Sequence, residues 1–238
     1  MKKRSYGFIA IVAVLVITFV ALVVFGLKNK ESEKIDYSKY DPYSFIEGND
    51  DNGGIADHVK GDLDKAKVVI YEYADFQCPG CAGVNPRVNT LLKEYDGKLA
   101  IIYRNYLLSY HQNGTAAASA AEAAGLQGYW KDYADMLFSN QSTWEYASAD
   151  ERTGMFIDLF REVTNNSGDY EKFQSDMKSK EVSKKLSFDQ GMGKIVDIQG
   201  TPSFYLDGEK IDFSNATGEE DFLKVFRDKI DEKLKNKS

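Results

Sequence analysis

The sequence predicts a small α/β domain with a helical insertion, preceded by one transmembrane helix. Three observations support this prediction. An unbroken apolar run opens the chain, from about residue 7 to 27. Two strand-like segments, 65–76 and 99–108, flank a helical pattern, as in a strand–helix–strand unit. A long helical region, from about 115 to 196, then separates them from a short hairpin and a final helix.

The apolar run is typical of an uncleaved membrane anchor, which we place at residues 1–27. Lys2, Lys3 and Arg4 precede it, and 21 residues at about 1.5 Å each span roughly 31 Å, enough to cross a bilayer's hydrocarbon core. A cleaved signal peptide, the alternative, has a shorter apolar stretch and a small-residue cleavage site. Basic residues on the two sides are nearly balanced, so charge alone does not orient the span.

A polar tether is expected at 28–62, between the anchor and the body. It lacks hydrophobic periodicity, and its Asn-, Asp- and Gly-rich stretch at 49–54 is typical of a solvated loop. The remaining chain, 63–236, is expected to form the globular domain. Aromatic residues near the end of the tether are expected to pack it onto that domain: Tyr37, Tyr40, Tyr43 and Phe45.

The domain begins with strand, helix and strand. The first strand contains the apolar, β-branched run from Val68 to Tyr71, which is typical of a buried strand. A helical pattern follows and ends at Asp96-Gly97, before the second strand at Leu99–Leu108. The helical insertion is then expected at about 110–196.

A hairpin and a helix close the chain. Gly200–Ser203 leads into a third strand, and Asp207-Gly208 is a hairpin-turn signal before a return strand at Lys210–Phe213. The last segment, about 218–235, is charged but carries apolar residues on one helical face.

The charge balance argues against a nucleic-acid partner. The chain has 30 basic and 37 acidic residues, a net charge of −7. Outside the first 27 residues, 27 basic residues face 37 acidic ones, which leaves −10. Phosphate binding requires a basic face, which an acidic body does not favour.

Cys78-Pro79-Gly80-Cys81 carries the candidate chemistry. A structural disulfide across so short a loop would constrain little chain entropy. A metal site needs about four ligands, and His58 and His111 do not lie at ligand spacing. Where a strand gives way to a helix, the free amides and the helix dipole favour a Cys78 thiolate and lower its pKa. The pattern therefore predicts a redox pair, with Cys78 reactive and Cys81, one turn later, less exposed and suited to a resolving role.

The motif and its context resemble the thiol-disulfide oxidoreductases of the DsbA type. The resemblance rests on Phe76–Cys81, on Gly200–Phe204 and on the stretch 116–144, and it spans about 57–235. It implies a thioredoxin-like fold with an inserted helical domain, in which Cys78 is the nucleophile. Anchored members of this kind occur in bacteria that lack a conventional periplasm.

The resemblance also implies roles for supporting residues. Pro202 matches a cis-proline that faces the cysteine pair, with Thr201 before it exposing a backbone edge to a substrate strand. Glu72 matches a buried acid whose raised pKa allows it to exchange protons with Cys81. An outward-facing strand residue is the alternative for Glu72.

One position departs from the family pattern. The best-known oxidants carry Cys-Pro-His-Cys, and the histidine helps to stabilise their thiolate. Here Pro79 is followed by Gly80. The loss of that donor is expected to leave Cys78 less acidic and the disulfide less oxidising, so the direction of electron flow stays open.

The sequence therefore predicts a thiol-disulfide oxidoreductase, acting as an oxidant on extracytoplasmic proteins. Expected partners are cysteine-containing secreted or surface proteins and a membrane quinone-linked protein that reoxidises the pair. We expect no cofactor and no metal. The expected location is the cell membrane, single-pass, with the domain outside, where disulfides persist. The alternatives are a reductase or isomerase on the same fold, and a metal-binding or metal-delivery module that uses Cys78, Cys81 and His111.

Overall fold

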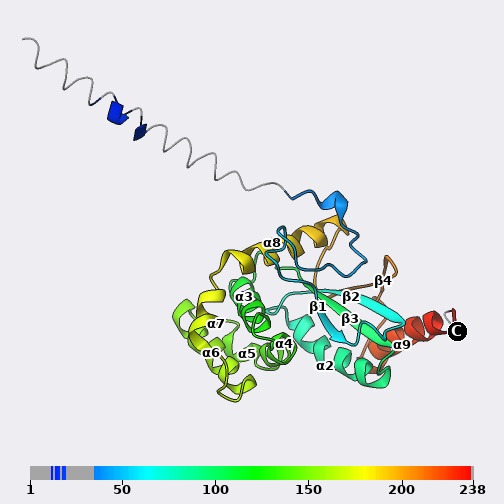
Figure 1. Cartoon of the computed structure of the whole chain (residues 1–238). Coiled ribbons are helices and arrows are strands. Elements are labelled where there is room, and N and C mark those ends of the chain that lie inside the picture. Colours follow the sequence, from blue (N-terminus) through cyan, green and yellow to red (C-terminus); the bar gives the residue numbers. More distant parts are fainter. Residues whose placement is uncertain (1–11, 13, 17, 20–34, 237–238) are drawn as a thin grey trace, which may run out of the picture. The chain divides into compact units, whose positions relative to one another are not determined.

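The computed structural model describes residues 12, 14–16, 18–19 and 35–236 (Figure 1). The chain divides into two compact units, Met1–Asp36 and Tyr37–Ser238. In the first unit, the described positions between 12 and 19 are helical.

The membrane anchor predicted at 1–27 lies largely outside the described residues. At the helical positions that are described, the Thr18 hydroxyl donates to the carbonyl oxygens of Val14 and Leu15, at 3.0 and 2.9 Å. Over the described parts of the chain we find no helix with the length and apolar content that a membrane crossing requires.

A mixed sheet forms the centre of the second unit. Its described strands lie in the order β1–β3–β2–β4–β5, with β2 and β3 parallel and the other neighbours antiparallel. Every residue of β3 is buried, as are nearly all of β2, because helices or loops cover both faces. The strands are β1 (His58–Gly61), β2 (Val68–Ala74), β3 (Leu99–Asn105), β4 (Ser203–Leu206) and β5 (Glu209–Lys210).

Helices cover both faces of this sheet (Figure 1). Apolar residues of α2 and α9 pack against β2, β3 and β4 in one core, whereas α8 contacts β3 and η1 on the other side. Helices α3 to α8 connect β3 to β4 and share a second core with the carboxyl end of β2. The helical segments are η1 (Tyr37–Lys39), α2 (Pro79–Glu94), α3 (Gly114–Gly125), α4 (Trp130–Ser139), α5 (Gln141–Trp144), α6 (Ala149–Val163), α7 (Tyr170–Asp176), α8 (Lys180–Ile195) and α9 (Glu219–Asn236).

The turn between β4 and β5 follows its sequence signal. Asp207 and Gly208 both have positive φ, +49° and +85°, as a tight hairpin turn requires. The return strand is shorter than the expected 210–213, since β5 covers only Glu209–Lys210. The Ile211 amide still donates to the Phe204 carbonyl, at 2.8 Å.

The segment predicted as a tether differs most from the sequence prediction. From Tyr37 onward it belongs to the same compact unit as the rest of the domain. Ile46 and Ile55 are buried, and the segment ends in the edge strand β1. The prediction missed this strand because it is short and buries a lysine, Lys60, which hydrophobic periodicity does not reveal.

Aromatic side chains attach this segment to the domain. Tyr40 packs edge-on against Phe188 of α8, with ring centroids 4.8 Å apart. Tyr43 contacts the rings of Tyr71 and Tyr205, and its carbonyl oxygen accepts a hydrogen bond from Tyr71 Oη at 2.6 Å.

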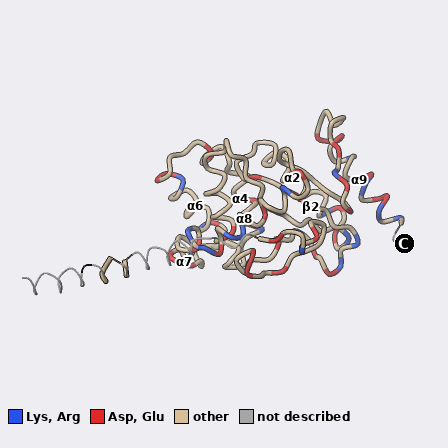
Figure 2. Tube along the Cα trace, turned by 90° about the horizontal axis from the view of Figure 1, so that it is seen from above, with Lys and Arg blue, Asp and Glu red and all other residues tan. Residues whose placement is uncertain are grey.

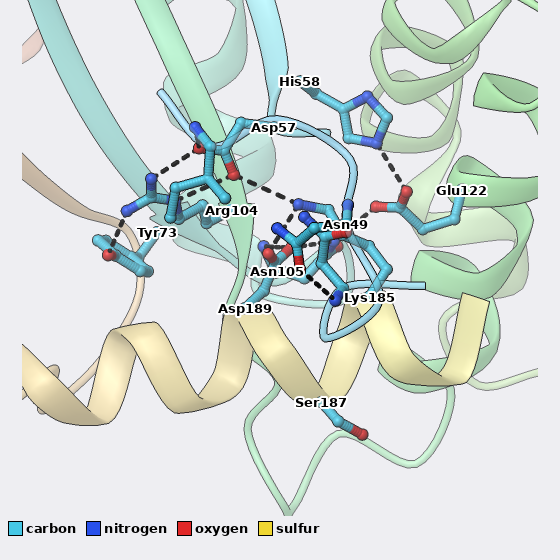
Figure 3. A network of polar contacts seen from close by, with 12 residues as sticks. Asn49, Asp57, His58, Tyr73, Arg104, Asn105, Glu122, Lys185, Ser187 and Asp189 are labelled. Carbon is cyan, nitrogen blue, oxygen red and sulfur yellow. Dashed lines mark hydrogen bonds and ion pairs between the residues drawn. The ribbon is translucent and has the colours of Figure 1, made fainter. Parts of the chain in front are cut away.

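A buried ionic network fixes the same segment to the sheet and to the helical insertion (Figure 3). Arg104 on β3 donates to both carboxylate oxygens of Asp57, at 3.2 and 2.6 Å. Lys185 on α8 contacts Asp57 at 3.3 Å and Asp189 at 2.8 Å. Burial alone raises the pKa of Asp57, but Lys185 and Arg104 together bring that pKa below its ordinary value.

The network continues into α3. Glu122 accepts from the side chain of Asn105 at 2.8 Å and lies 2.7 Å from His58 Nε2. Asn105 also donates to Asp189, at 3.0 Å. The His58 ring stacks on Trp130, with 4.2 Å between the ring centroids. The network therefore joins β1 and β3 to α3 and α8.

We predict that Asp57→Asn destabilises the domain by about 3–5 kcal/mol, because Arg104 and Lys185 would keep buried charges that no longer balance. Urea unfolding of the two proteins measures this difference. The matched control is Asp228→Asn. Asp228 pairs with Lys224 on the exposed surface of α9, where acidic and basic positions alternate (Figure 2). This change is expected to leave stability nearly unaltered. Equal effects of both substitutions would contradict the role given to the network.

Candidate active site

Cys78 is the N-cap residue of α2 and follows the end of β2 by four residues. Its backbone is extended, with φ −75° and ψ 121°, and its amide donates to the Asp75 carbonyl oxygen at 3.0 Å. Pro79 occupies the first turn of the helix, where a missing N–H costs no helical hydrogen bond. The local sequence thus places the Cys78 sulfur at the amino end of a 16-residue helix.

The two cysteines differ in their access to solvent. Both are free thiols. Cys78 keeps 8% of its surface exposed, whereas Cys81 has none. Both residues are largely buried, and Cys78 is the more exposed of the two.

The surroundings of Cys78 favour its anion. The Cys81 thiol donates a hydrogen bond to the Cys78 sulfur, and this lowers the pKa of Cys78 to about 5 against the opposing effect of burial. The Thr201 side chain and the backbone amides of Cys81 and Gly80 add to the same effect. Burial raises the pKa of Cys81 well above its ordinary value, and its hydrogen bond to Cys78 raises it further. The pair thus holds one acidic and one weakly acidic thiol.

Thr201 and Pro202 face the cysteine pair from across the site. The peptide bond between them is cis. As a thiol, Cys78 donates to the Thr201 carbonyl oxygen at 3.2 Å. The Thr201 hydroxyl is buried and has no hydrogen-bond partner among the described residues, so it is free to donate once Cys78 ionises.

Gly80 lies tightly against this loop. A Cβ atom there would stand 3.2 Å from Pro202 Cδ and 3.6 Å from Cys78 Sγ. A histidine at this position, as in the best-known oxidants, would therefore require the proline loop to shift by a few tenths of an ångström. The glycine allows the closer approach.

Two amide side chains, those of Gln77 and Gln141, tie the turn before Cys78 to the helical insertion. Gln141 Nε2, on α5, donates to the carbonyl oxygens of Phe76 and Cys78, at 2.7 and 3.0 Å. Gln77 Nε2 donates to the Glu145 carbonyl oxygen at 2.6 Å, and its Oε1 accepts from the Asn113 amide at 2.6 Å. Without Gln141, two buried carbonyl groups would lose a partner.

Asp75 organises the other side of the same turn. Its carboxylate accepts from the amides of Gln77 and Leu108, both at 2.8 Å. The same carboxylate lies 2.9 Å from His111 Nδ1. His111 is thus paired with an acid. Among the described residues, no group of three or more His, Cys, Asp or Glu side chains is arranged to hold a metal ion.

Glu72 lies on β2 and is 2% exposed. Burial raises the pKa of Glu72 to about 7, although Lys60 opposes the shift. The strand register pairs Lys60 with Ile101 and Glu72 with Tyr103, so both side chains lie on the face of the sheet that α2 covers. The negative charge of Glu72 in turn helps to raise the pKa of Cys81.

Lys60 connects this acid to a polar cluster that the sequence did not indicate. Its Nζ atom is fully buried and donates to Asn85 of α2 at 2.6 Å and to Asp135 of α4 at 2.9 Å. Asp135 is 27% exposed and lines a surface pocket of about 540 Å³. The cluster draws on β1, α2 and α4, so no local motif could reveal it.

This fold and the cysteine-bearing helix define the class of protein. The family model described as thioredoxin matches residues 55–226, which is most of the chain. The chain therefore belongs to the thioredoxin family. With its helices inserted between β3 and β4, it has the DsbA-type form of that fold.

Solved structures share this architecture. The oxidised form of BdbD from Bacillus subtilis is 20% identical, with a TM-score of 0.63, over 81% of this chain and 99% of that one. The α-DsbA1 protein of Wolbachia pipientis is 21% identical, with a TM-score of 0.57, over 74% of this chain and 89% of that one. At these identities the likeness is one of fold.

One of the curated relatives is a much longer protein. Na(+)/H(+) antiporter NhaA 3 of Salinispora tropica is 29% identical over 154 residues, which make up 65% of this chain and 22% of the antiporter. The chain thus spans about a fifth of the length of the curated relatives it matches.

We predict that Cys78 of the reduced protein titrates with a midpoint near pH 5. Thiolate absorbance at 240 nm and the rate of alkylation by iodoacetamide would both follow this midpoint. Because the pKa is lowered on folding, the Cys78 thiolate stabilises the reduced fold at high pH, and this contribution is lost as the pH falls toward 5. Cys78→Ser is the control and removes the transition. A midpoint between 8 and 9 would contradict the assigned environment.

We predict that Glu72→Gln stabilises the protein at pH 8 by an amount on the order of 3 kcal/mol. A folded pKa of about 7 means that burial of Glu72 adds stability at low pH, which is lost as the pH rises from about 4.5 through 7. Urea unfolding at pH 4 and pH 8 measures this. At pH 4 the two proteins should be equally stable. A difference in stability as large at pH 4 as at pH 8 would show that ionisation of Glu72 is not its cause.

Proposed function

We propose that this protein is a thiol-disulfide oxidoreductase that oxidises cysteine pairs in other proteins. The observation that carries the proposal is the asymmetry of the pair. Cys78 keeps 8% of its surface exposed and has a pKa of about 5, and it lies beside a fully buried Cys81 whose pKa is raised. The fold similarity to BdbD and α-DsbA1 supports the same class of reaction.

The first step forms a mixed disulfide. A substrate thiolate attacks Cys78 Sγ of the Cys78–Cys81 disulfide, a new sulfur–sulfur bond forms, and Cys81 leaves with the electron pair. The high pKa of Cys81 means that the leaving sulfur takes up a proton. Glu72, with a pKa of about 7, is protonated about half of the time at neutral pH and is the candidate donor.

The second step releases the product. A second substrate thiolate attacks the substrate sulfur of the mixed disulfide, and Cys78 leaves as a thiolate. A thiol with a pKa of about 5 is a good leaving group, so this step is favoured. Two electrons pass from the substrate dithiol to the pair, which ends as the Cys78 thiolate and the Cys81 thiol.

The low pKa of Cys78 supports oxidation over reduction. A stabilised thiolate stabilises the reduced form, which makes the disulfide a stronger oxidant. Gly80 supports the opposite direction, because a histidine donor is lacking there. A reductase or isomerase on the same site is therefore the second candidate.

We further propose that the domain acts outside the cytoplasm, held at the membrane by residues 7–27. The apolar run supports the anchor, and the chemistry supports a compartment where disulfides persist. Its partners would be cysteine-containing secreted or surface proteins and a quinone-linked membrane protein that reoxidises Cys78 and Cys81.

We predict that Cys78→Ser abolishes oxidation of a dithiol peptide. Cys81→Ala should instead accumulate a mixed disulfide through Cys78, visible by non-reducing electrophoresis and mass spectrometry. A reduction potential of about −120 mV would support the oxidant, and a potential of about −270 mV would support the reductase. Full activity in Cys78→Ser would exclude the proposed function.

A further inference from the structure

A buried aspartate lies between the end of β2 and the cysteine-bearing helix. Asp75 directly follows Ala74, the last residue of β2, and has no exposed surface. Its main chain contacts both cysteines. The carbonyl oxygen accepts from the Cys78 amide at 3.0 Å. Burial raises the pKa of Cys81, and a backbone hydrogen bond from Asp75 opposes that rise. The position of the Asp75 main chain therefore affects the surroundings of both sulfurs.

The side chain of Asp75 continues the pairing of β2 with β3 beyond the ends of the two strands. Just past the ladder, the Tyr106 amide donates to the Ala74 carbonyl oxygen at 2.9 Å. Two residues later, the Leu108 amide donates to the Asp75 carboxylate instead, at 2.8 Å. The other carboxylate oxygen accepts from the Gln77 amide, also at 2.8 Å. Each oxygen thus accepts from a backbone N–H, so an amide side chain, which has only one oxygen, cannot satisfy both.

His111 holds this carboxylate from the loop between β3 and α3. Its Nδ1 atom lies 2.9 Å from Asp75 Oδ2, the same oxygen that binds the Leu108 amide. Because that carboxylate accepts hydrogen bonds on both oxygens, His111 Nδ1 is the donor. Gly114, the first residue of α3, limits the space on the other side, where a Cβ atom would stand 2.7 Å from Asp75 Oδ1. The carboxylate is therefore held between His111 and the start of α3.

We propose that His111 is a positioning residue for the cysteine pair and that it acts through Asp75. The contacts run from the His111 ring to the Asp75 carboxylate, and from the Asp75 main chain to Cys78 and Cys81. Without the imidazole donor, the carboxylate holds the turn less firmly, and the Cys78 amide and sulfur shift relative to the start of α2. A small displacement of this kind is costly where a charge must be stabilised. The inference rests on the proposed function for its effect on catalysis, whereas the acidity of Cys78 is measurable without any substrate.

His58 provides a matched control within the same chain, which has two histidines. Each imidazole side chain is 12% exposed, and each pairs with a fully buried carboxylate. His58 lies 2.7 Å from Glu122, and His111 lies 2.9 Å from Asp75. Glu122 belongs to the ionic network that joins the sheet to the helical insertion, whereas Asp75 binds the Cys78 amide. Loss of either imidazole removes a similar contact, but only the contact of His111 leads to the cysteine pair.

The test follows the titration of Cys78 in the reduced protein, by thiolate absorbance and by the rate of alkylation. His111→Ala should raise the midpoint by about one pH unit, because the turn then stabilises the thiolate about tenfold less. The equilibrium constant for reduction of the disulfide should fall by the same factor, which is about 30 mV in reduction potential. His111→Asn should retain the parent midpoint, since its Nδ2 atom donates from near the position of the imidazole Nδ1 and carries no charge. His58→Ala should lose a similar amount of stability in urea but keep the parent midpoint.

The direction of the shift in Asp75→Ala separates position from charge. Removal of a nearby negative charge would by itself lower the Cys78 midpoint, whereas loss of positioning raises it, and we expect a rise. An unchanged midpoint in His111→Ala would overturn the inference. An equal shift in His58→Ala would do the same, as would a shift in His111→Asn as large as that in His111→Ala. If the midpoints move as expected but the parent protein oxidises no dithiol peptide, the proposed function fails while the positioning role of His111 stands.

Discussion

The hydrogen bond between the two thiols is the interaction on which the rest of the site depends. Cys81 donates to Cys78, so the proton stays on Cys81 and the charge develops on Cys78, the more exposed of the two residues. Elements around the pair maintain this difference in pKa between the two thiols. The start of α2 presents backbone amides to Cys78, Thr201 approaches it from the other side, and the core excludes water from Cys81. A change that brought water to Cys81 would reduce the difference between the two sulfurs.

The helical insertion supports this chemistry as well as the fold. Gln141 and the Asn113 backbone N–H bind the turn before Cys78 from one side, and the ionic network around Asp57 and Glu122 joins the insertion to the sheet from another. Buried polar groups of this kind tolerate the loss of a partner poorly. The insertion therefore keeps a defined position against the strand that leads to Cys78, and it supplies the loops that border the site.

Sequence reasoning was most successful where function depends on neighbours along the chain. The strand before Cys78, the helix start at Pro79 and the turn at Asp207 all follow from local patterns, and the structure shows each of them. It failed at β1, which is short, and at Lys60, whose charged side chain is buried by residues from distant elements. It also missed Gln141, because an amide side chain in a helical region carries no signal that it will bind a carbonyl group 63 residues earlier.

The sequence by itself determined the reacting atoms and the strand-to-helix setting that makes one of them acidic, since a helix amino end lies next to Cys78 wherever that local structure forms. Only the tertiary structure decided how completely Cys81 is buried, whether Glu72 faces outward or lies buried, and which loops surround the pair. The reason is physical: desolvation and side-chain hydrogen bonds depend on residues brought together from separate elements. For Glu72, one strand position is compatible with either an exposed acid or a buried one, and helix α2, packed over that face of the sheet, settles which it is.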